Sequence, residues 1–465
     1  MENSHDRGTN LVLRLDRLPF SRWHRTLFII SFLGIMFDAM DFAFFGAALP
    51  AISKEFKLGP AQAGMLATIG LVGAFIGALL WGSLSDYIGR KTSFQATVGI
   101  FAIFTGLMSA SWSVASLAVT RFFANIGLGG EQPVTGTLFT EYMPSKVRGK
   151  ASGNMLAAFP AGMVAAALIG LLVVPTLGWR VLFIIGVAPA ILIFFIRRSV
   201  PESVRYLLSK GKMNEAERVV DFIEKKALGP GAPPRDVAES VDFRAEVGTG
   251  AKKRVTVFEL FSPGLIRRTI LVWIVSFGFL WSSNGIMFML PTILVQRGFS
   301  LKQAISFILV QAIFGYFGYS TCSFLIDSYG RRPVLFLYYL IGAAFHLWFA
   351  YASGFWMYAA IALVGWVNPG VYGGNIVYVS ELYPTHLRAT GVGWFFGIGR
   401  IGSFLAPAVV GFMMASGLGK YVLHTFAISY FVSAIALIAV GIETRGLILE
   451  KSSATRSLSQ NSEKA

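Results

Sequence analysis

The stretch GSLSDYIGRK at residues 82–91 occurs a second time, in altered form, as SFLIDSYGRR at residues 323–332. The two copies align Asp86 with Asp327, an offset of 241 residues. Two further pairs keep nearly the same offset: TEYMPSKVRGKASG at 140–153 with SELYPTHLRATGVG at 380–393, and PESVRYLLSKGK at 201–212 with IETRGLILEK at 442–451. Three collinear matches indicate an internal duplication that spans the chain.

The composition places this duplicated chain in a lipid bilayer. Of its 465 residues, 55% are apolar and only 14% are charged, whereas soluble domains carry roughly 25% charged residues. A set of water-soluble domains and a disordered chain are therefore both excluded. The solitary Cys322 excludes an intrachain disulfide and a cysteine-based metal site.

Hydropathy divides the chain into segments long enough to cross a membrane, for which roughly 20 apolar residues are needed. We predict an all-α membrane protein with twelve transmembrane helices in two six-helix, pseudo-symmetric bundles. The predicted helices cover residues 26–52, 62–85, 92–111, 115–141, 150–174, 179–197, 267–295, 303–326, 333–353, 355–381, 389–416 and 420–442.

The net charge of +16 is spread unevenly: basic residues gather before the first span, in alternate loops, in the long central segment and in the tail. The positive-inside rule then puts both termini and the central segment in the cytoplasm. The first apolar stretch is too long for a cleavable signal and is expected to remain as an anchor. The predicted parts are an N-terminal segment (1–25), a first bundle (26–198), a linker (199–264), a second bundle (265–445) and a tail (446–465).

The linker itself combines a charged, helix-prone piece (201–226), a Gly/Pro-rich stretch (228–235) and a basic run (252–254). We interpret the basic residues as contacts to lipid headgroups rather than to nucleic acid or protein. Two bundles in parallel repeat are typical of a transporter whose substrate site lies between the halves near the membrane midplane.

The chain resembles the major facilitator superfamily over nearly its whole length, through GSLSDYIGRK, RFFANIGLGGE (121–131), PES (201–203) and ETRG (443–446). These motifs look like the branch that holds sugar porters and organic ion transporters. RLDRLPFSRWH (14–24), FDAMDFAFFGAALPAI (37–52) and SELYPTHLRATGVGW (380–394) are similar to bacterial niacin permeases and aromatic acid/proton symporters. The symporters usually carry glycine after the first of the paired aspartates, where Ala39 stands here, which favours the niacin permeases.

Ionisable residues inside the spans are the candidates for coupling transport to protons, because a charge at the bilayer centre costs at least about 2.5 kcal/mol and needs a partner or water. Asp38 and Asp41 lie three residues apart on one helical face, and Arg121 and Glu131 belong to the fourth span. Since the first and fourth spans run in opposite directions, Asp41 should lie level with Arg121, and Asp38 with Glu131. A static pair that only fastens two helices is the competing interpretation, and Asp38 and Glu131 could equally be structural. The resemblance to sugar/proton symporters, in which the matching acid and arginine pair, supports a role in coupling.

Arg400 is the candidate anion-binding residue. It lies near the midplane of the eleventh span, in FFGIGRIGSFLAP, among small residues and with no acid inside the same bundle. An unpaired cation at that depth calls for an anionic ligand, and the resemblance to organic anion transporters implies the same role.

Aromatic and amide side chains near this arginine would suit a flat heteroaromatic acid. Phe277, Trp281, Asn284 and Phe288 follow one helical face, as do Asn368, Tyr372 and Asn375, and Gln311 is the one amide inside the eighth span. Packing or lipid contact is the alternative for such stripes. The predicted substrate-binding set is Arg400, Trp281, Asn284, Gln311, Tyr372 and Asn375. His346 and Cys322 are predicted to be packing residues.

The repeated loops predict a cytoplasmic gate made by Asp86, Arg90, Glu141 and Arg148, with Asp327, Arg331, Glu381 and Arg388 as the second copy. We expect Asp86 to bond the first-turn amides of a neighbouring helix and Arg148, and Arg90 to reach Glu141. A role in membrane insertion alone is the competing interpretation.

The sequence thus predicts a secondary active transporter of the bacterial inner membrane, multi-pass and functional as a monomer, that imports nicotinate or a related aromatic monocarboxylate with protons. Its expected partners are the small organic anion, the proton and the bilayer; no cofactor, metal, catalytic residue or nucleic acid is expected. The alternatives are a sugar porter, a drug or cation exporter, or a sensor of the same fold that does not transport.

Overall fold

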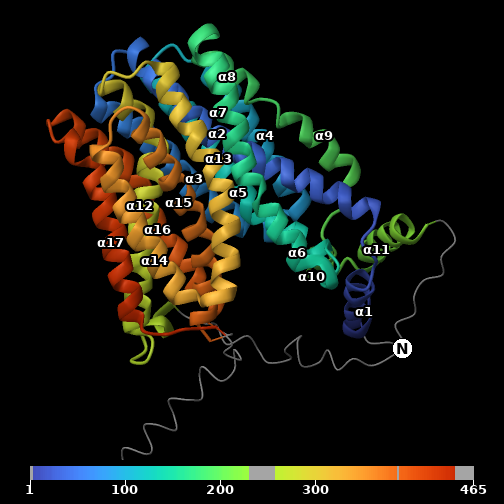
Figure 1. The fold of residues 1–465 in the computed structure, drawn as a ribbon. Helices are drawn as coiled ribbons and strands as arrows, with labels where there is room; N and C mark the ends of the chain where they lie inside the picture. Colours follow the sequence, from blue (N-terminus) through green and yellow to red (C-terminus); the bar gives the residue numbers. More distant parts are fainter. Residues whose placement is uncertain (1–3, 230–256, 385–386, 446–465) are drawn as a thin grey trace, which may run out of the picture. The chain divides into compact units, whose positions relative to one another are not determined.

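The computed structural model describes residues 4–229, 257–384 and 387–445, and these residues form helices without a strand. The chain divides into two compact units (Figure 1). The first comprises Met1–Phe56 and Ile69–Phe243, and the second comprises Lys57–Thr68 and Arg244–Ala465. Nine helices among the described residues are long and apolar enough to span a membrane.

The first unit contains the six predicted spans of the N-terminal half, except the first residues of α3 up to Thr68, which belong to the second unit. Two of the six spans are interrupted. The fifth span breaks at Ala157, and Pro160 three residues later has no N–H to bond the carbonyl of the preceding turn. The sixth breaks between Ile185 and Ala190, ahead of which stands Pro189. The helices are α1 (Ser4–Asp16), α2 (Arg22–Glu55), α3 (Pro60–Ile88), α4 (Arg90–Ser109), α5 (Val114–Tyr142), α6 (Ser145–Leu156), α7 (Ala158–Leu177), α8 (Trp179–Ile185), α9 (Ala190–Ser199), α10 (Val204–Ser209) and α11 (Met213–Leu228).

The second unit contains the six predicted spans of the C-terminal half as unbroken helices. Ser300 starts one of them with a capping box, in which its Oγ accepts from Gln303 N at 3.2 Å while Gln303 Oε1 accepts from Ser300 N at 3.0 Å. The helices are η2 (Val257–Phe261), α12 (Ile266–Gln296), α13 (Leu301–Tyr329), α14 (Arg331–Tyr351), α15 (Phe355–Leu382), α16 (Arg388–Ala415), η3 (Gly419–Tyr421) and α17 (Val422–Val440).

One close helix crossing is present in both units and confirms that the sequence repeat is structural. A Cβ on Gly77 of α3 would collide with the backbone of Ile126 on α5, and a Cβ on Gly318 of α13 would collide with the backbone of Trp366 on α15. The two glycines are 241 residues apart, and the residues whose backbones they touch, Ile126 and Trp366, are 240 apart. Both crossings therefore depend on a glycine that lets the helix backbones touch.

The linker and the N-terminal segment contribute helices outside the spans. The predicted helix-prone piece of the linker forms α10 and α11, and the basic run at 252–254 lies outside the described residues. Helix α1 was not predicted. Arg14 of α1 donates to Glu224 of α11 at 2.9 Å and to Asp221 at 2.7 Å, which fixes α1 against α11. These bonds raise the pKa of Arg14 above its ordinary value, with the hydrogen bond to Glu224 as the largest cause.

Candidate functional site

A buried ion pair joins α2 and α5 inside the first unit. Arg121 Nη1 lies 2.7 Å from Asp41 Oδ2, and the two side chains are 0% and 1% exposed. The guanidinium carbon also lies 4.0 Å from the centre of the Phe45 ring. Gly70 of α3 makes room for the arginine, since a Cβ there would lie 2.7 Å from Arg121 Nε. The predicted pairing of Asp41 with Arg121 is confirmed.

Three polar atoms of this ion pair have no hydrogen-bond partner among the described residues. Arg121 Nε and Nη2 and Asp41 Oδ1 are buried without a hydrogen-bond partner among the described residues. A buried polar atom without a partner costs about 1–3 kcal/mol. The pair therefore retains three polar atoms that a further donor or acceptor could bond.

A second pair of acids lies on the same two helices. Asp38 of α2 and Glu131 of α5 are buried electrostatic neighbours, and Glu131 packs against Gly34 of α2, where a Cβ would stand 2.5 Å from Oε1. Neither oxygen of Asp38 receives a hydrogen bond from a donor group of the described chain. Two carboxyl groups can bond each other only when one of them carries a proton. A hydrogen bond between Asp38 and Glu131 would therefore require a proton on one of the two groups.

Arg400 on α16 stands apart from the acids of its own unit. Its half-buried guanidinium makes no ion pair and no hydrogen bond with any residue that the structure describes. Its electrostatic neighbour is the phenol of Tyr372 on α15. A guanidinium offers five donors in a planar fork that matches a carboxylate.

Aromatic rings gather around Tyr372, the electrostatic neighbour of Arg400. The ring of Tyr372 lies 6.1 Å from that of Phe279 and 6.0 Å from that of Phe396. Tyr319 of α13 is a further electrostatic neighbour of Tyr372 and packs against Gly373. Sequence reasoning missed Tyr319, although its spacing of eight residues from Gln311 puts both on one stripe of α13.

The amides predicted to contact substrate are not equally available. Asn375 donates to Tyr339 OH at 2.8 Å and is 1% exposed, so it already serves to join α14 and α15. Asn284 donates to the carbonyl of Leu280 in its own helix at 3.3 Å. The Gln311 side chain has no hydrogen bond to any described residue. Of these three amides, Gln311 keeps its full hydrogen-bonding capacity.

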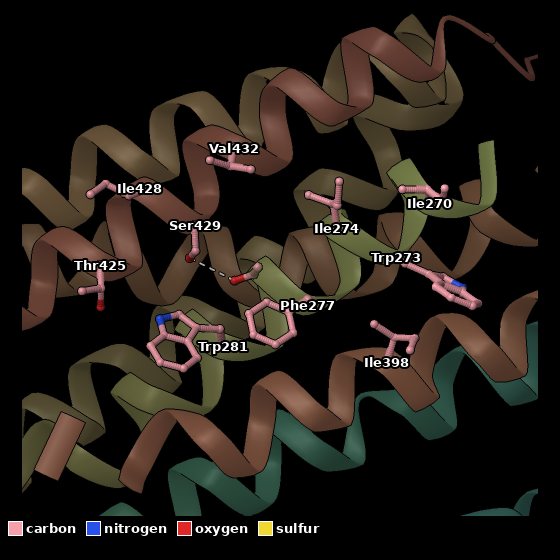
Figure 2. A pocket seen from close by; sticks show the side chains of 11 residues that line it. Ile270, Trp273, Ile274, Phe277, Trp281, Ile398, Thr425, Ile428, Ser429 and Val432 are labelled. Carbon is pink, nitrogen blue, oxygen red and sulfur yellow. Dashed lines mark hydrogen bonds between the residues drawn. The ribbon is translucent and has the colours of Figure 1, made fainter. Parts of the chain in front are cut away.

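Trp281 lies in a different setting from Arg400. Together with Phe277, whose ring is stacked 6.0 Å away, it lines an apolar groove formed by α12, α16 and α17 (Figure 2). The groove encloses about 690 Å³, and its other walls include Ile274 and Ile428. Trp281 lines this groove, whereas Arg400, Gln311 and Asn375 do not.

On the side of the linker, each unit carries a cluster of charges built on the repeated loops. In the first unit, Arg90 Nε donates to Glu141 Oε1 at 3.1 Å, as expected, and Ser203 Oγ donates to the same carboxylate. In the second, Arg331 Nε donates to Glu381 Oε2 at 3.1 Å and Thr444 Oγ1 donates to it at 2.5 Å. We call these the first and second linker-side clusters.

The expected bonds of Asp86 are corrected by the structure. Its carboxylate is 66% exposed and pairs with Arg90 of the following helix at 2.7 Å, while Arg148 bonds Asp16 of α1 instead. Asp327 likewise is 72% exposed and lies 3.5 Å from Arg331. Arg388 Nε donates to the carbonyl of Ser380 at 2.8 Å. A four-residue step is short enough for Asp86 to reach Arg90, so Arg148 is left to the unpredicted helix α1.

The helix N-termini that Asp86 was expected to cap are capped by two other acids. Glu202 Oε1 accepts from Arg90 N at 2.8 Å and Lys91 N at 3.1 Å. In the second unit, Glu443 accepts from Arg331 N at 2.9 Å and from Arg332 N at 3.0 Å. The repeat that aligns Glu202 with Glu443 was the available signal for this role.

Glu443 shows how strongly such a cap holds its charge. Burial by itself would raise the pKa of Glu443, but the backbone N–H groups of Arg445, Arg331, Arg332 and Thr444 all donate to its carboxylate and lower the pKa below its ordinary value. A negative charge at a helix N-terminus is stabilised further by the helix dipole. The carboxylate therefore stays ionised and locks α14 to the chain after α17.

Comparison with known proteins decides the family. The family "Sugar (and other) transporter" matches residues 26–455. The chain belongs to this family. It is 33% identical over 443 residues to the niacin transporter NiaP of Acinetobacter baylyi, covering 95% of this chain and 99% of the relative. It is 29% identical to the 4-hydroxybenzoate transporter PcaK of the same organism, over 92% of this chain and 93% of that protein.

Solved structures support the same fold. The D-xylose-proton symporter superposes with a TM-score of 0.71 at 17% identity, over 91% of this chain and 99% of that one. A partially occluded, inward-open structure of XylE from E. coli gives a TM-score of 0.72 at 18% identity, over 92% of this chain and 100% of that one. The predicted major facilitator fold is thereby confirmed. As a member of this family, the chain is a multi-pass membrane transporter and not an enzyme.

Proposed function

We propose that this transporter imports a small organic anion, nicotinate or a related aromatic monocarboxylate, together with protons. The observation that carries the proposal is the guanidinium of Arg400, which lies inside a membrane-spanning helix without a counter-ion among the described residues. Such a charge is stabilised when a ligand carboxylate occupies the fork. The names of the relatives NiaP and PcaK point to the same class of substrate.

Arg400 would bind the carboxylate, and the rings around Tyr372 would bind the face of the aromatic ligand. Gln311 retains an amide for a ring nitrogen or hydroxyl. We assign a smaller contribution to the other three predicted residues. Asn284 and Asn375 already make hydrogen bonds within the second unit, and Trp281 lines the apolar groove.

Proton coupling is assigned to the acids of the first unit. Asp41 would exchange Arg121 for a proton during the transport cycle, and Asp38 with Glu131 would pass that proton along α2 and α5. The unsatisfied atoms of Arg121 and Asp41 support this assignment, since they show that the pair is not saturated. The two linker-side clusters would act as the gate by stabilising one conformation of the cycle over the other.

The proposed location is the inner membrane of a bacterium, with both termini and the linker in the cytoplasm and the monomer as the working unit. A sugar porter, a drug or cation exporter and a non-transporting sensor are the alternatives. A lone arginine favours an anion over a sugar or cation. The sensor is disfavoured by the presence of a linker-side cluster in both units.

Uptake of radiolabelled nicotinate into cells that express the transporter tests the proposal. We expect uptake by the parent protein and its loss in Arg400→Gln, with part retained in Arg400→Lys, because lysine keeps the charge without the planar fork. Arg297→Gln is the matched control, since Arg297 is an exposed arginine of the same unit beyond the end of α12. Undiminished nicotinate affinity in purified Arg400→Gln would refute the anion site. Binding of sugars or organic cations in place of nicotinate and benzoate would favour the alternatives.

A further inference from the structure

The apolar groove between α12, α16 and α17 opens toward the lipid rather than toward a polar site. Ile270, Ile274, Ile428 and Val432 line it and are 45%, 38%, 61% and 43% exposed. Exposed aliphatic side chains on a membrane-spanning helix face lipid tails. The groove volume of about 690 Å³ falls within the roughly 300–1,000 Å³ of specific ligand sites. It is therefore a shaped recess in a lipid-facing surface.

The floor of the groove is closed by contacts between its own helices. A Cβ on Gly278 of α12 would stand 2.5 Å from Ser433 Oγ and 2.7 Å from the Ser429 carbonyl, so α12 and α17 touch at this glycine. Ser429 Oγ donates to the Gly278 carbonyl at 3.0 Å, a bond drawn in Figure 2. The serine hydroxyl is consumed by this bond, which leaves apolar walls for the occupant.

The length of the groove matches one leaflet. Its α12 wall extends from Ile270 to Trp281, a span of eleven residues and about 16 Å of helix. The hydrocarbon core of a bilayer is about 30 Å thick, so one leaflet contributes about 15 Å. An acyl chain lying along the groove would thus run from the membrane surface to near the midplane.

Polar donors stand at the end of the groove near the first turn of α12. Arg267 lies three residues before Ile270 on the same helical stripe and is exposed. Its Nη2 donates to the carbonyl of Ala439 at 3.1 Å, while Arg332 donates to the neighbouring carbonyl of Ile438 at 3.0 Å. The ring of Trp273 lines the groove, while its indole N–H is buried.

We propose that this groove binds one anionic phospholipid, with an acyl chain against Ile274, Phe277 and Trp281 and the phosphate at Arg267. The leaflet is the one at the first turn of α12, which is the cytoplasmic leaflet in the topology proposed above. An apolar channel of leaflet length with an exposed arginine at one end complements the acyl chain and the phosphate of an anionic lipid.

Native mass spectrometry of the full chain, released from nanodiscs of equal phosphatidylglycerol and phosphatidylcholine, tests this site. We expect one phosphatidylglycerol to be retained preferentially by the parent protein. Arg267→Gln should weaken its retention about fivefold, the factor that one basic residue contributes near an anionic surface. Arg218→Gln, an exposed arginine of α11, is the control for general loss of charge.

A second test fills the groove with a larger side chain. Val432→Trp places a bulky side chain in the groove and should abolish retention of the lipid, whereas Ile435→Trp, at an exposed residue of the same helix that does not line the groove, should leave it unchanged. Equal retention of the two lipids by the parent, equal effects of Arg267→Gln and Arg218→Gln, or equal effects of the two tryptophan variants would each overturn the proposal. A dimer that loses its contact in Val432→Trp would assign the groove to a second copy instead.

Discussion

The membrane interiors of the two units share a scaffold and differ in chemistry. The first holds Asp38, Asp41, Arg121 and Glu131 at the contact of two helices, with one ion pair at 2.7 Å. The second holds Arg400 without a described counter-ion, and its other buried polar groups are neutral. Among these neutral contacts, Asn375 donates to Tyr339 at 2.8 Å and Ser282 Oγ lies 3.0 Å from His346 Nε2.

This difference arises from side chains and not from the helical framework. Gly77 and Gly318 make equivalent crossings in the two units, so the duplicated framework tolerates opposite electrostatics. Acids that can exchange a proton are held in one unit, and a cation that can attract an anion is held in the other. Under the proposed function, proton and substrate would be handled by separate halves, and the following predictions test that separation.

The largest effect should come from breaking the buried pair. Arg121→Gln leaves the Asp41 carboxylate buried without its cation, which costs about 3–5 kcal/mol and should lower the unfolding temperature by roughly 10 °C. Arg400→Gln removes an arginine that has no described partner, and it should shift the unfolding temperature little. Thermal unfolding of the purified variants, followed by tryptophan fluorescence, measures both. Equal losses of stability would mean that the two arginines are held alike and that the contrast between the units is not real.

The next largest effect should be the loss of proton coupling, and only substitutions in the first unit should cause it. In Asp41→Asn, nicotinate should still exchange across the membrane in counterflow, while accumulation against a gradient falls about tenfold or more because the proton site is lost. Counterflow of labelled nicotinate and uptake driven by an imposed pH gradient separate the two activities. If accumulation persists and still follows the pH gradient, the coupling proton is carried elsewhere, with Asp38 and Glu131 as the next residues to replace.

The sequence predicted the positions of spans and the level at which ionisable residues meet. Asp41 and Arg121 pair because helices of opposite direction bring residues of equal depth together, and depth follows from residue count alone. The break at Ala157 was also within reach, since Pro160 is visible in the sequence, but hydropathy averages over such a residue. The continuous span predicted for 150–174 was wrong at this point.

Side-chain partners across the bundle could not be predicted, because they depend on rotation of each helix about its axis. Asn375 and Tyr372 lie three residues apart on α15, yet one donates to Tyr339 and the other lies beside Arg400. Trp281 was expected near the substrate and lines the lipid-facing groove instead. Arg148 was assigned to Asp86 because α1, which supplies Asp16, has no apolar signal of its own.

A smaller effect is expected from the helix cap of the second linker-side cluster. Because the folded-state pKa of Glu443 is lowered, its contribution to stability is fully present above the ordinary glutamate pKa of about 4.3 and is lost as the pH falls through the folded-state value. Glu443→Gln should cost about 1 kcal/mol at neutral pH after allowance for solvent screening. The difference in unfolding temperature between Glu443→Gln and the parent should therefore narrow as the pH falls below the ordinary glutamate pKa of about 4.3.

Glu202→Gln is the matched variant in the first unit. Its carboxylate accepts from the amides of Arg90, Lys91 and Ser203, one donor fewer than Glu443 receives. We expect a loss of stability of the same sign and somewhat smaller size. A gap between Glu443→Gln and the parent that widens in acid would contradict the assigned direction of the Glu443 shift.

The smallest effect should come from Asp86, which the sequence alone had placed in the gate. Its carboxylate is 66% exposed and pairs only with Arg90 among the described residues, so neutralising it removes an exposed pair that contributes about 0.5 kcal/mol. If that pair stabilises the outward-open state, Asp86→Asn should raise the inward-open population by about twofold at most. Maleimide labelling of Asn154→Cys, in a background where Cys322 is replaced by serine, should then be slightly faster, and labelling of Pro291→Cys slightly slower.

Arg148→Gln, which also removes the contact to Asp16 of α1, should change both rates more than Asp86→Asn does. A tenfold change from Asp86→Asn alone would restore the aspartate to the gate, and no change from either variant would assign the first linker-side cluster to insertion and folding.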